Sequence, residues 1–127
     1  LFFCMFFYFF AVIPVLYNKI TVNRGDTHTL HLVFKANNSP LDLTGAIVFF
    51  TVKKDLNDPD SLAQIAKSIA PIPSPALGIV DIELTEEDTS IAGEYYYDIQ
   101  LKQSNNSIQS SQRGKFIIEQ DVTLRVS

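Results

Sequence analysis

The side chains that could do chemistry in this sequence are few and poorly grouped. His28 and His31 have an odd spacing, which on a strand directs them to opposite faces, so we interpret them as two surface histidines and not as a metal site. The three carboxylates of residues 86–88 form the densest acidic group. No histidine, lysine or arginine stands close in the sequence to tune them for acid–base catalysis. They are instead typical of the start of a short helical turn that Thr85 caps.

Two further stretches resemble known sites and are better explained as loops. Residues 55–60 open like a calcium-binding loop, but Pro59 and Asp60 replace the residues that such a loop needs. Residues 24–26 read Arg-Gly-Asp, which some adhesion receptors recognise, and we interpret them as a tight turn. Cys4 is the single cysteine, so no disulfide can form within the chain. We therefore predict no catalytic, cofactor-binding or metal-binding residue, no cofactor and no enzymatic activity.

Residues 93–101 give the clearest prediction of a strand in the chain. With a period of two, Tyr95 and Tyr97 fall on one face together with Ile99 and Leu101, while polar side chains occupy the other face apart from one tyrosine. This alternation is typical of an antiparallel strand that has one face on a core and the other in water.

Other stretches show the same alternation and are separated by turn signals. Residues 27–35 and 78–84 alternate cleanly, whereas residues 46–53 are apolar on both faces, which indicates a central strand or one covered by a partner. Residues 63–70 suit an edge strand, although a helix is also possible, and prolines end the element. The strands recur at roughly ten-residue spacing, which favours a β-sandwich.

These patterns together predict an all-β chain. We expect an immunoglobulin-like antiparallel β-sandwich of about seven to eight strands with one short helical turn near residues 85–90. The order of strand, turn, glycine and tyrosine strand resembles the E–F corner of such sandwiches, where a tyrosine hydroxyl bonds to the upstream backbone. Either Tyr95 or Tyr97 would be that corner tyrosine, and the alternative is that both simply belong to a tyrosine-rich core face.

Residues 1–17 form an apolar segment in which no charge occurs, and we place the β-sandwich domain at residues 18–127. A helix of this length would reach about 25 Å, less than the hydrocarbon thickness of a membrane. Three interpretations remain open. The segment is a signal-like membrane anchor, a strand or helix that docks on a partner subunit, or an artefact of translation begun upstream of the true start. We favour the artefact.

The charge of the chain bears on its partners. The net charge is −4, and the lysines and arginines are scattered, which argues against a nucleic-acid groove. A membrane partner is expected only if residues 1–17 are a real anchor.

Several short motifs occur in an order that resembles a phage family. They lie at residues 24–27 (Arg-Gly-Asp-Thr), 40–46 (Pro-Leu-Asp-Leu-Thr-Gly-Ala), 78–85 (Gly-Ile-Val-Asp-Ile-Glu-Leu-Thr), 93–101 (Gly-Glu-Tyr-Tyr-Tyr-Asp-Ile-Gln-Leu), 114–118 (Gly-Lys-Phe-Ile-Ile) and 121–123 (Asp-Val-Thr). Together they resemble the N-terminal domain of phage baseplate upper proteins and related small tail proteins. That resemblance implies an immunoglobulin-like structural module without catalytic residues.

Two functions remain in view. The resemblance implies a non-enzymatic virion protein of the tail or baseplate, which contacts other virion proteins and forms a homo-oligomer in a symmetric assembly. Its strand edges and the outer face of residues 46–53 would be the contact surfaces. The alternative is a bacterial cell-surface or membrane-anchored immunoglobulin-like adhesion module, with residues 1–17 as its anchor.

Overall fold

The computed structural model describes residues 2–9, 16–17, 19–36 and 39–120, and the side chains of residues 19–35, 39–108 and 113–120. Within these ranges the chain forms ten strands and two short 3-10 helices. The strands are β1 (Phe2–Phe9), β2 (Leu16–Tyr17), β3 (Ile20–Asn23), β4 (His28–Ala36), β5 (Ser39–Pro40), β6 (Ile47–Lys53), β7 (Ile65–Ile69), β8 (Ile79–Leu84), β9 (Gly93–Lys102) and β10 (Ile108–Glu119). The 3-10 helices are η1 (Asp60–Leu62) and η2 (Pro75–Leu77).

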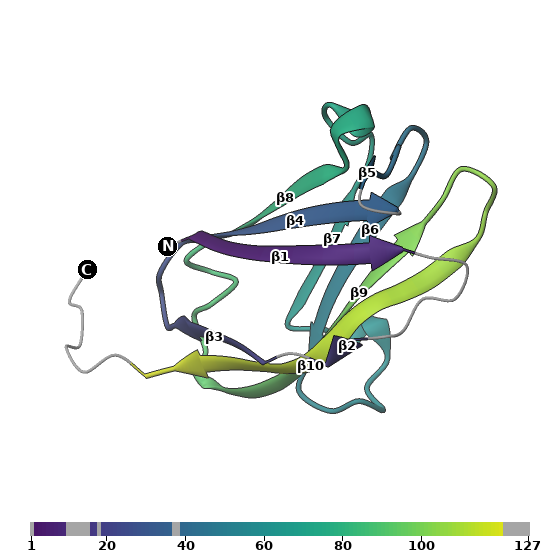
Figure 1. Ribbon diagram of the computed structural model, residues 1–127. Coiled ribbons are helices and arrows are strands. Elements are labelled where there is room, and N and C mark those ends of the chain that lie inside the picture. The colour runs from purple at the N-terminus through teal and green to yellow at the C-terminus, as the bar shows by residue number, and fades with distance from the viewer. Residues whose placement is uncertain (1, 10–15, 18, 37–38, 121–127) are drawn as a thin grey trace.

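The strands form two facing sheets (Figure 1). Sheet A has the order β1-β4-β5, with β8 also paired to β4. Sheet B has the order β2-β10-β9-β6-β7, with β3 also paired to β10. The predicted all-β sandwich is therefore confirmed. The number of strands exceeds the prediction because β1 joins sheet A and because β2 and β5 are two-residue strands that no sequence pattern marks.

The tyrosine strand β9 lies at the centre of sheet B and its predicted alternation is confirmed. Tyr95 and Tyr97 are buried, as are Ile99 and Leu101. The rings of Phe50, Tyr97 and Phe116, one from each of three adjacent strands, pack with centroids 6.0–6.4 Å apart. Burying an aromatic side chain stabilises a fold by about 2–3 kcal/mol, so this trio anchors sheet B in the core.

On strand β4, the structure corrects the interpretation of His28 as a surface histidine. Leu30, Leu32 and Phe34 are fully buried, as the alternation predicts, but His28 is also only 4% exposed. His28 shares the parity of those residues and therefore faces the core, so its assignment to the surface was wrong. His31 lies on the opposite face, where its Nδ1 contacts Oδ1 of Asp81 at 2.5 Å.

Strands β6 and β7 occupy the positions that the sequence predicts. β6 is central, since it pairs with β9 on one side and with β7 on the other. Val48, Phe50 and Val52 face the core, while the side chains between them are partly exposed on the outer face. Residues 65–69 form the edge strand of sheet B, so the helical alternative for this stretch was wrong.

The pairing of the N-terminal strands differs from the predicted antiparallel arrangement. β1 pairs with β4 in parallel, and β2 and β3 pair with β10 in parallel, whereas the other ladders are antiparallel. Parallel neighbours cannot be joined by a tight hairpin. The partners β3 and β10 are separated by most of the chain, which makes parallel pairing possible and leaves it without a local sequence signal.

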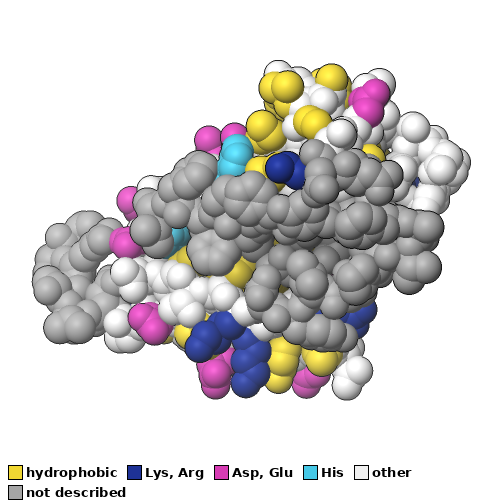
Figure 2. Space-filling model, in the orientation of Figure 1, with side chains coloured by type: hydrophobic (Ala, Val, Ile, Leu, Met, Phe, Trp, Pro, Cys, Tyr) yellow, Lys and Arg dark blue, Asp and Glu magenta, His cyan; other side chains and the backbone are white. Residues whose placement is uncertain are grey.

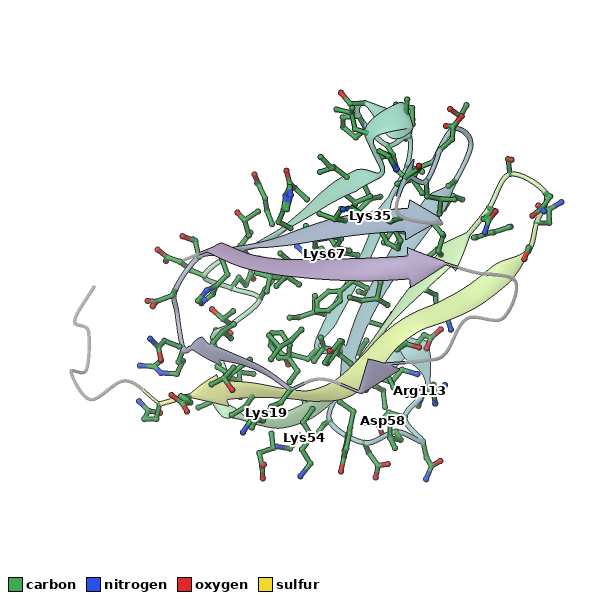
Figure 3. All side chains as sticks on the ribbon, viewed as in Figure 1. Lys19, Lys35, Lys54, Asp58, Lys67 and Arg113 are labelled. Carbon is green, nitrogen blue, oxygen red and sulfur yellow. The ribbon has the colours of Figure 1, made fainter. Side chains whose placement is uncertain are left out.

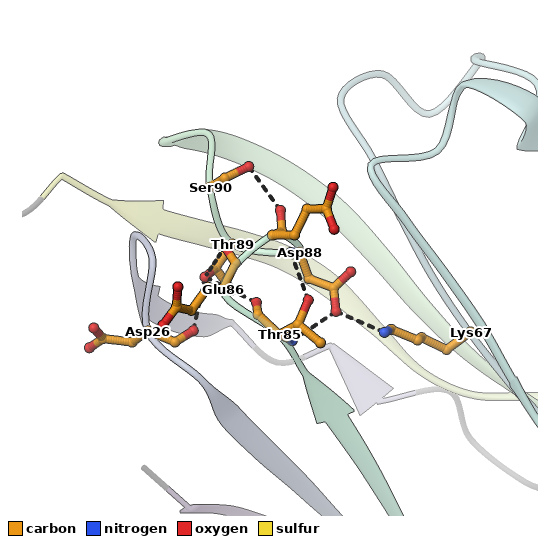
Figure 4. A network of polar contacts seen from close by, with 8 residues as sticks. Asp26, Lys67, Thr85, Glu86, Asp88, Thr89 and Ser90 are labelled. Carbon is orange, nitrogen blue, oxygen red and sulfur yellow. Dashed lines mark hydrogen bonds and ion pairs between the residues drawn. The ribbon is translucent and has the colours of Figure 1, made fainter. Parts of the chain in front are cut away.

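A hydrogen-bonded turn connects β8 to β9 (Figure 4). The Asp88 backbone N–H donates to Oγ1 of Thr85 at 3.2 Å, and the Thr85 N–H donates to Oδ2 of Asp88 at 2.9 Å. This reciprocal pair is a capping box, so the capping role predicted for Thr85 is confirmed. Lys67 of the edge strand β7 adds an ion pair to Asp88, with Nζ 2.8 Å from Oδ2.

The same turn holds the loop between β3 and β4. Thr89 is fully buried and its hydroxyl donates to the Asp26 carbonyl at 2.9 Å. The Gly25 N–H donates to the Thr89 carbonyl at 3.0 Å. Gly25 has a φ of +76°, which glycine adopts without steric cost, so residues 24–26 are the tight turn that the sequence predicts.

The predicted tyrosine corner is present and Tyr95 supplies it. The Tyr95 hydroxyl donates to the Ile91 carbonyl at 2.8 Å, four residues upstream. The Nζ of Lys54 lies 4.9 Å from the centroid of the Tyr95 ring and so adds a cation–π contact. This corner fixes the path of the chain from the turn into β9.

Smaller features divide between confirmation and correction. Residues 104–107 predict a turn from the sequence, and the hairpin between β9 and β10 does close there, at Gln103 and Ser107. The pair Arg113-Gly114 predicts a bulge, but the irregularity in that ladder lies between Ser110 and Gln112. Residues 121–126, which the sequence predicts as a final short strand or an exit linker, lie outside the described residues.

Candidate docking surface

The histidines and the carboxylates considered in the sequence do not come together in the fold. His28 faces the core and His31 the outer side of sheet A. Among the residues that the structure describes, no group of three or more His, Cys, Asp or Glu side chains could hold a metal ion. The carboxylate of Asp88 is engaged by Thr85 and Lys67. The sequence predicted no catalytic residue, so the site that remains to be described is a surface.

Helices long and apolar enough to cross a membrane are absent from the described part of the chain.

The outer face of sheet B carries an ordered set of polar, charged and aromatic side chains. In one row across the strands, Tyr96 of β9 stands between Lys53 of β6 and Lys115 of β10. In the next row, Asp98 of β9 stands between Thr51 and Arg113. Directly opposed side chains on neighbouring strands lie within contact distance. Tyr96 and Asp98 therefore each have a partner on either side.

This face is hollowed into a groove with two connected sections. The first section, about 190 Å³, is lined by Lys53, Asp60 and Asp98 among others. The second section, about 550 Å³, is lined by Lys19, Gly114 and Lys115 among others. Leu56, Tyr96, Tyr97 and Arg113 line both sections and so join them. We call the whole feature the sheet B groove.

The two sections of the groove differ in charge. In the first section, Lys53 Nζ pairs with Oδ1 of Asp60 at 2.6 Å. Burial raises the pKa of the Asp98 carboxyl, and the charges of Lys53 and Arg113 oppose that rise. Gln100 Nε2 also donates to Asp98 at 3.4 Å. The first section is thus close to internally neutral, whereas the second is lined by cations.

Figure 3 shows where the labelled cations lie. Lys19 and Arg113 project from the β3–β10 side of the molecule, and Lys35 belongs to β4 in the other sheet. In the space-filling view, Lys and Arg side chains (dark blue) lie along the lower edge together with Asp and Glu (magenta) and hydrophobic ones (yellow) (Figure 2). The second section of the groove combines positive charge with exposed apolar surface, since Lys19 and Lys115 line it together with Leu56.

The sequence predicted only part of this surface. It identified residues 46–53 as a strand whose outer face could be covered, and Phe49 and Thr51 of that face line a further hollow of about 190 Å³ beside β7. It placed the Asp98 side chain in water. In the structure, Asp98 lines the same groove as Leu56 and Asp60 of the loop after β6. The available signal was Leu56, a large apolar residue in a polar loop, which is 69% exposed.

Known proteins provide an independent comparison. The model of the family described as BppU N-terminal domain matches residues 14–125. Curated proteins show no significant match to the sequence. The N-terminal domain of phage TP901-1 ORF48 is 12% identical, covers 91% of this chain and 98% of its own, and superposes with a TM-score of 0.52. The PmoD soluble domain from Methylocystis sp. ATCC 49242 (Rockwell) is also 12% identical, covers 80% of this chain and 77% of its own, and gives a TM-score of 0.46.

The family match agrees with the order of motifs in the sequence. The likeness to the TP901-1 domain is a likeness of fold, and it spans nearly all of both chains. The family match covers the described sandwich from β2 to β10. The resemblance derived from the sequence is confirmed, and the chain belongs to the BppU N-terminal domain family of phage baseplate upper proteins.

Proposed function

We propose that this domain is a non-enzymatic structural module of a phage tail baseplate and that it works by binding other virion proteins. The observation that carries the proposal is the family match over residues 14–125. In this function the sandwich is a rigid body, and its outer surfaces and strand edges hold it in a symmetric assembly.

The described surface supports a binding role. The perturbed carboxyl of Asp98 could in principle mark an acid–base site, because such groups cluster in active sites. Its neighbours in the groove, however, are the Lys53–Asp60 ion pair and Arg113, which balance charge and do not form a nucleophile–base pair. Exposed apolar side chains flanked by cations are instead typical of a protein-binding surface.

The proposal is tested by locating the chain in phage particles. Particles would be purified from a producing host, and their proteins identified by mass spectrometry after chemical cross-linking. We expect the chain to co-purify with particles at a fixed ratio to other tail proteins. We also expect cross-links from its lysines, Lys115 for example, to those proteins.

Two outcomes would contradict the proposal. The first is absence of the chain from particles that contain all other tail proteins. The second is its recovery in the envelope fraction of the host, which would support the adhesion module with residues 1–17 as anchor. Deletion of the gene serves as the control, because loss of a structural module should give particles with incomplete tails.

A further inference from the structure

The second section of the sheet B groove has a charge opposite to that of the whole chain. The chain has a net charge of −4. Lys19, Arg113 and Lys115 line this section and are exposed, and its described lining contains no carboxylate. Such a local reversal of sign attracts a partner of negative charge.

The same section has an apolar floor. Leu56 is 69% exposed and Tyr96 is 37% exposed, and both line it. Cross-strand pairing places Lys53 and Lys115 on either side of Tyr96. The Nζ of Lys53 is held by Asp60, so the positive charge beside Tyr96 comes mainly from Lys115. Tyrosine is enriched at the energetic centre of protein interfaces.

We propose that the sheet B groove binds an extended acidic segment of a neighbouring baseplate protein. An apolar side chain of that segment rests on Leu56 and Tyr96, and the carboxylates of the segment face Lys19 and Lys115. Arg113, whose charge also acts on Asp98, lies between the two sections. This inference rests on the proposed function, since it names the chemistry of one partner of the structural module.

The arrangement favours a polypeptide over a nucleic acid. A nucleic-acid backbone presents phosphates at a regular short spacing and needs a continuous positive track. Asp60 and Asp98 interrupt the track in the first section. A polypeptide can confine its carboxylates to the second section and present amide or hydroxyl donors to Asp98, whose carboxylate already accepts from Gln100.

The size of the groove limits the segment. A hollow of about 550 Å³ accepts the side chains of a few residues. A contact of that size binds weakly by itself, with a Kd of about 10–100 μM. Repetition of the contact around a symmetric baseplate would raise the effective affinity by about 10²-fold or more.

The test uses the full chain and a fluorescently labelled peptide in which Asp and Glu residues flank a central Phe. Binding is followed by anisotropy. One control peptide carries Asn and Gln in place of the acids, and another carries Ala in place of Phe. The variants are Arg113→Glu with Lys115→Glu, Lys115→Glu alone, Leu56→Ser, and Lys35→Glu on β4, away from the groove, which matches the single reversal at Lys115 in charge (Figure 3). Far-ultraviolet circular dichroism and thermal melting confirm that each variant folds.

We expect the acidic peptide to bind at least about tenfold more tightly than its neutral counterpart, and to weaken as salt is raised. The Arg113→Glu/Lys115→Glu variant should lose about tenfold or more, Leu56→Ser should lose severalfold, and Lys35→Glu should change binding by less than about twofold.

Three outcomes with the peptides would overturn the inference. They are equal binding of the acidic and neutral peptides, an equal effect of Lys35→Glu and Lys115→Glu, and no binding of any acidic probe. Preferential binding of an oligonucleotide of similar charge would also overturn it. These failures are distinct from failure of the proposed function, because a chain that is found in particles and cross-linked to tail proteins can still lack this groove contact.

Discussion

At the level of single residues, His28 is the group that couples pH to the core. Its ring is buried on the face of β4 that also carries Leu30, and its Nε2 has no hydrogen-bond partner in the described structure. Burial lowers the pKa of the His28 imidazole from its ordinary value of 6.5, and this effect exceeds the rise caused by the hydrogen bond that the ring donates to the Asn23 backbone and by the nearby Asp26 charge. The folded protein therefore favours the neutral ring.

This burial predicts a pH-dependent stability. Because the pKa of His28 is lower in the folded state, the unfolded chain binds the proton more readily, and the stability falls as pH drops below about 6.5. We expect the urea midpoint to decline between pH 7.5 and 5.5. His28→Leu should remove most of that decline, while a matched His31→Leu variant on the outer face should retain it. An equal decline in both variants would contradict the prediction.

The corner tyrosine gives a second prediction at this scale. Tyr95→Phe removes the hydroxyl that donates to the Ile91 carbonyl at 2.8 Å and leaves the ring in place. The free energy of unfolding should fall by about 1 kcal/mol, since one part-buried hydrogen bond is lost without a cavity. Tyr96→Phe, on the exposed face of the same strand, is the control and should change stability by less than about 0.5 kcal/mol. Urea titration of both variants measures the difference.

At the level of elements, the turn between β8 and β9 connects three parts of the sandwich. Burial alone would raise the pKa of the Asp88 carboxyl, but hydrogen bonds from Lys67 and from the Thr85 backbone outweigh it and hold the pKa below the ordinary value of 3.8. Since this is an acid whose pKa is depressed by folding, its contribution to stability is present above about pH 4. It is lost as pH falls through the folded-state pKa.

Thr85→Ala tests this turn. It removes the hydroxyl that accepts the Asp88 N–H and should lower the free energy of unfolding by about 1 kcal/mol. Glu87→Ala in the same turn is the matched control, because Glu87 contributes only its backbone carbonyl, which accepts from the Ser90 N–H and hydroxyl. Chemical denaturation at neutral pH should separate the two variants, and equal losses would show that Thr85 does not act as the cap.

Elements whose structure depends on nearby residues were predicted from the sequence. Features that depend on residues far apart in the chain were not. The alternation of residues 93–101 and the turn at Thr85 are local, so both were predicted correctly. His28 was misassigned because its polarity was given more weight than its parity with Leu30. Lys19 and Arg113 meet in the groove only because β3 and β10 pair in parallel across the chain, and no local pattern carries that information.

At the level of the whole molecule, β1 bears on how the sandwich behaves in solution. β1 pairs along β4 from Thr29 to Ala36, opposite the side on which β4 pairs with β8. The family match begins at residue 14, after β1, and the buried side chains that the structure describes run from Ile20 to Ile118. The family match therefore does not extend over β1.

A chain of residues 18–127 should therefore fold and also self-associate. Its described core is retained, but removal of β1 exposes the backbone N–H and C=O groups of β4, which can pair with another copy. We expect sedimentation velocity to show concentration-dependent association that the full chain lacks. Val33→Lys in the shortened chain places a charge on the opened edge and should suppress the association, because lysine on an edge strand disfavours pairing. If the shortened chain stayed monomeric, β1 would not protect the β4 edge, and if it failed to unfold cooperatively, the sandwich would not begin at residue 18.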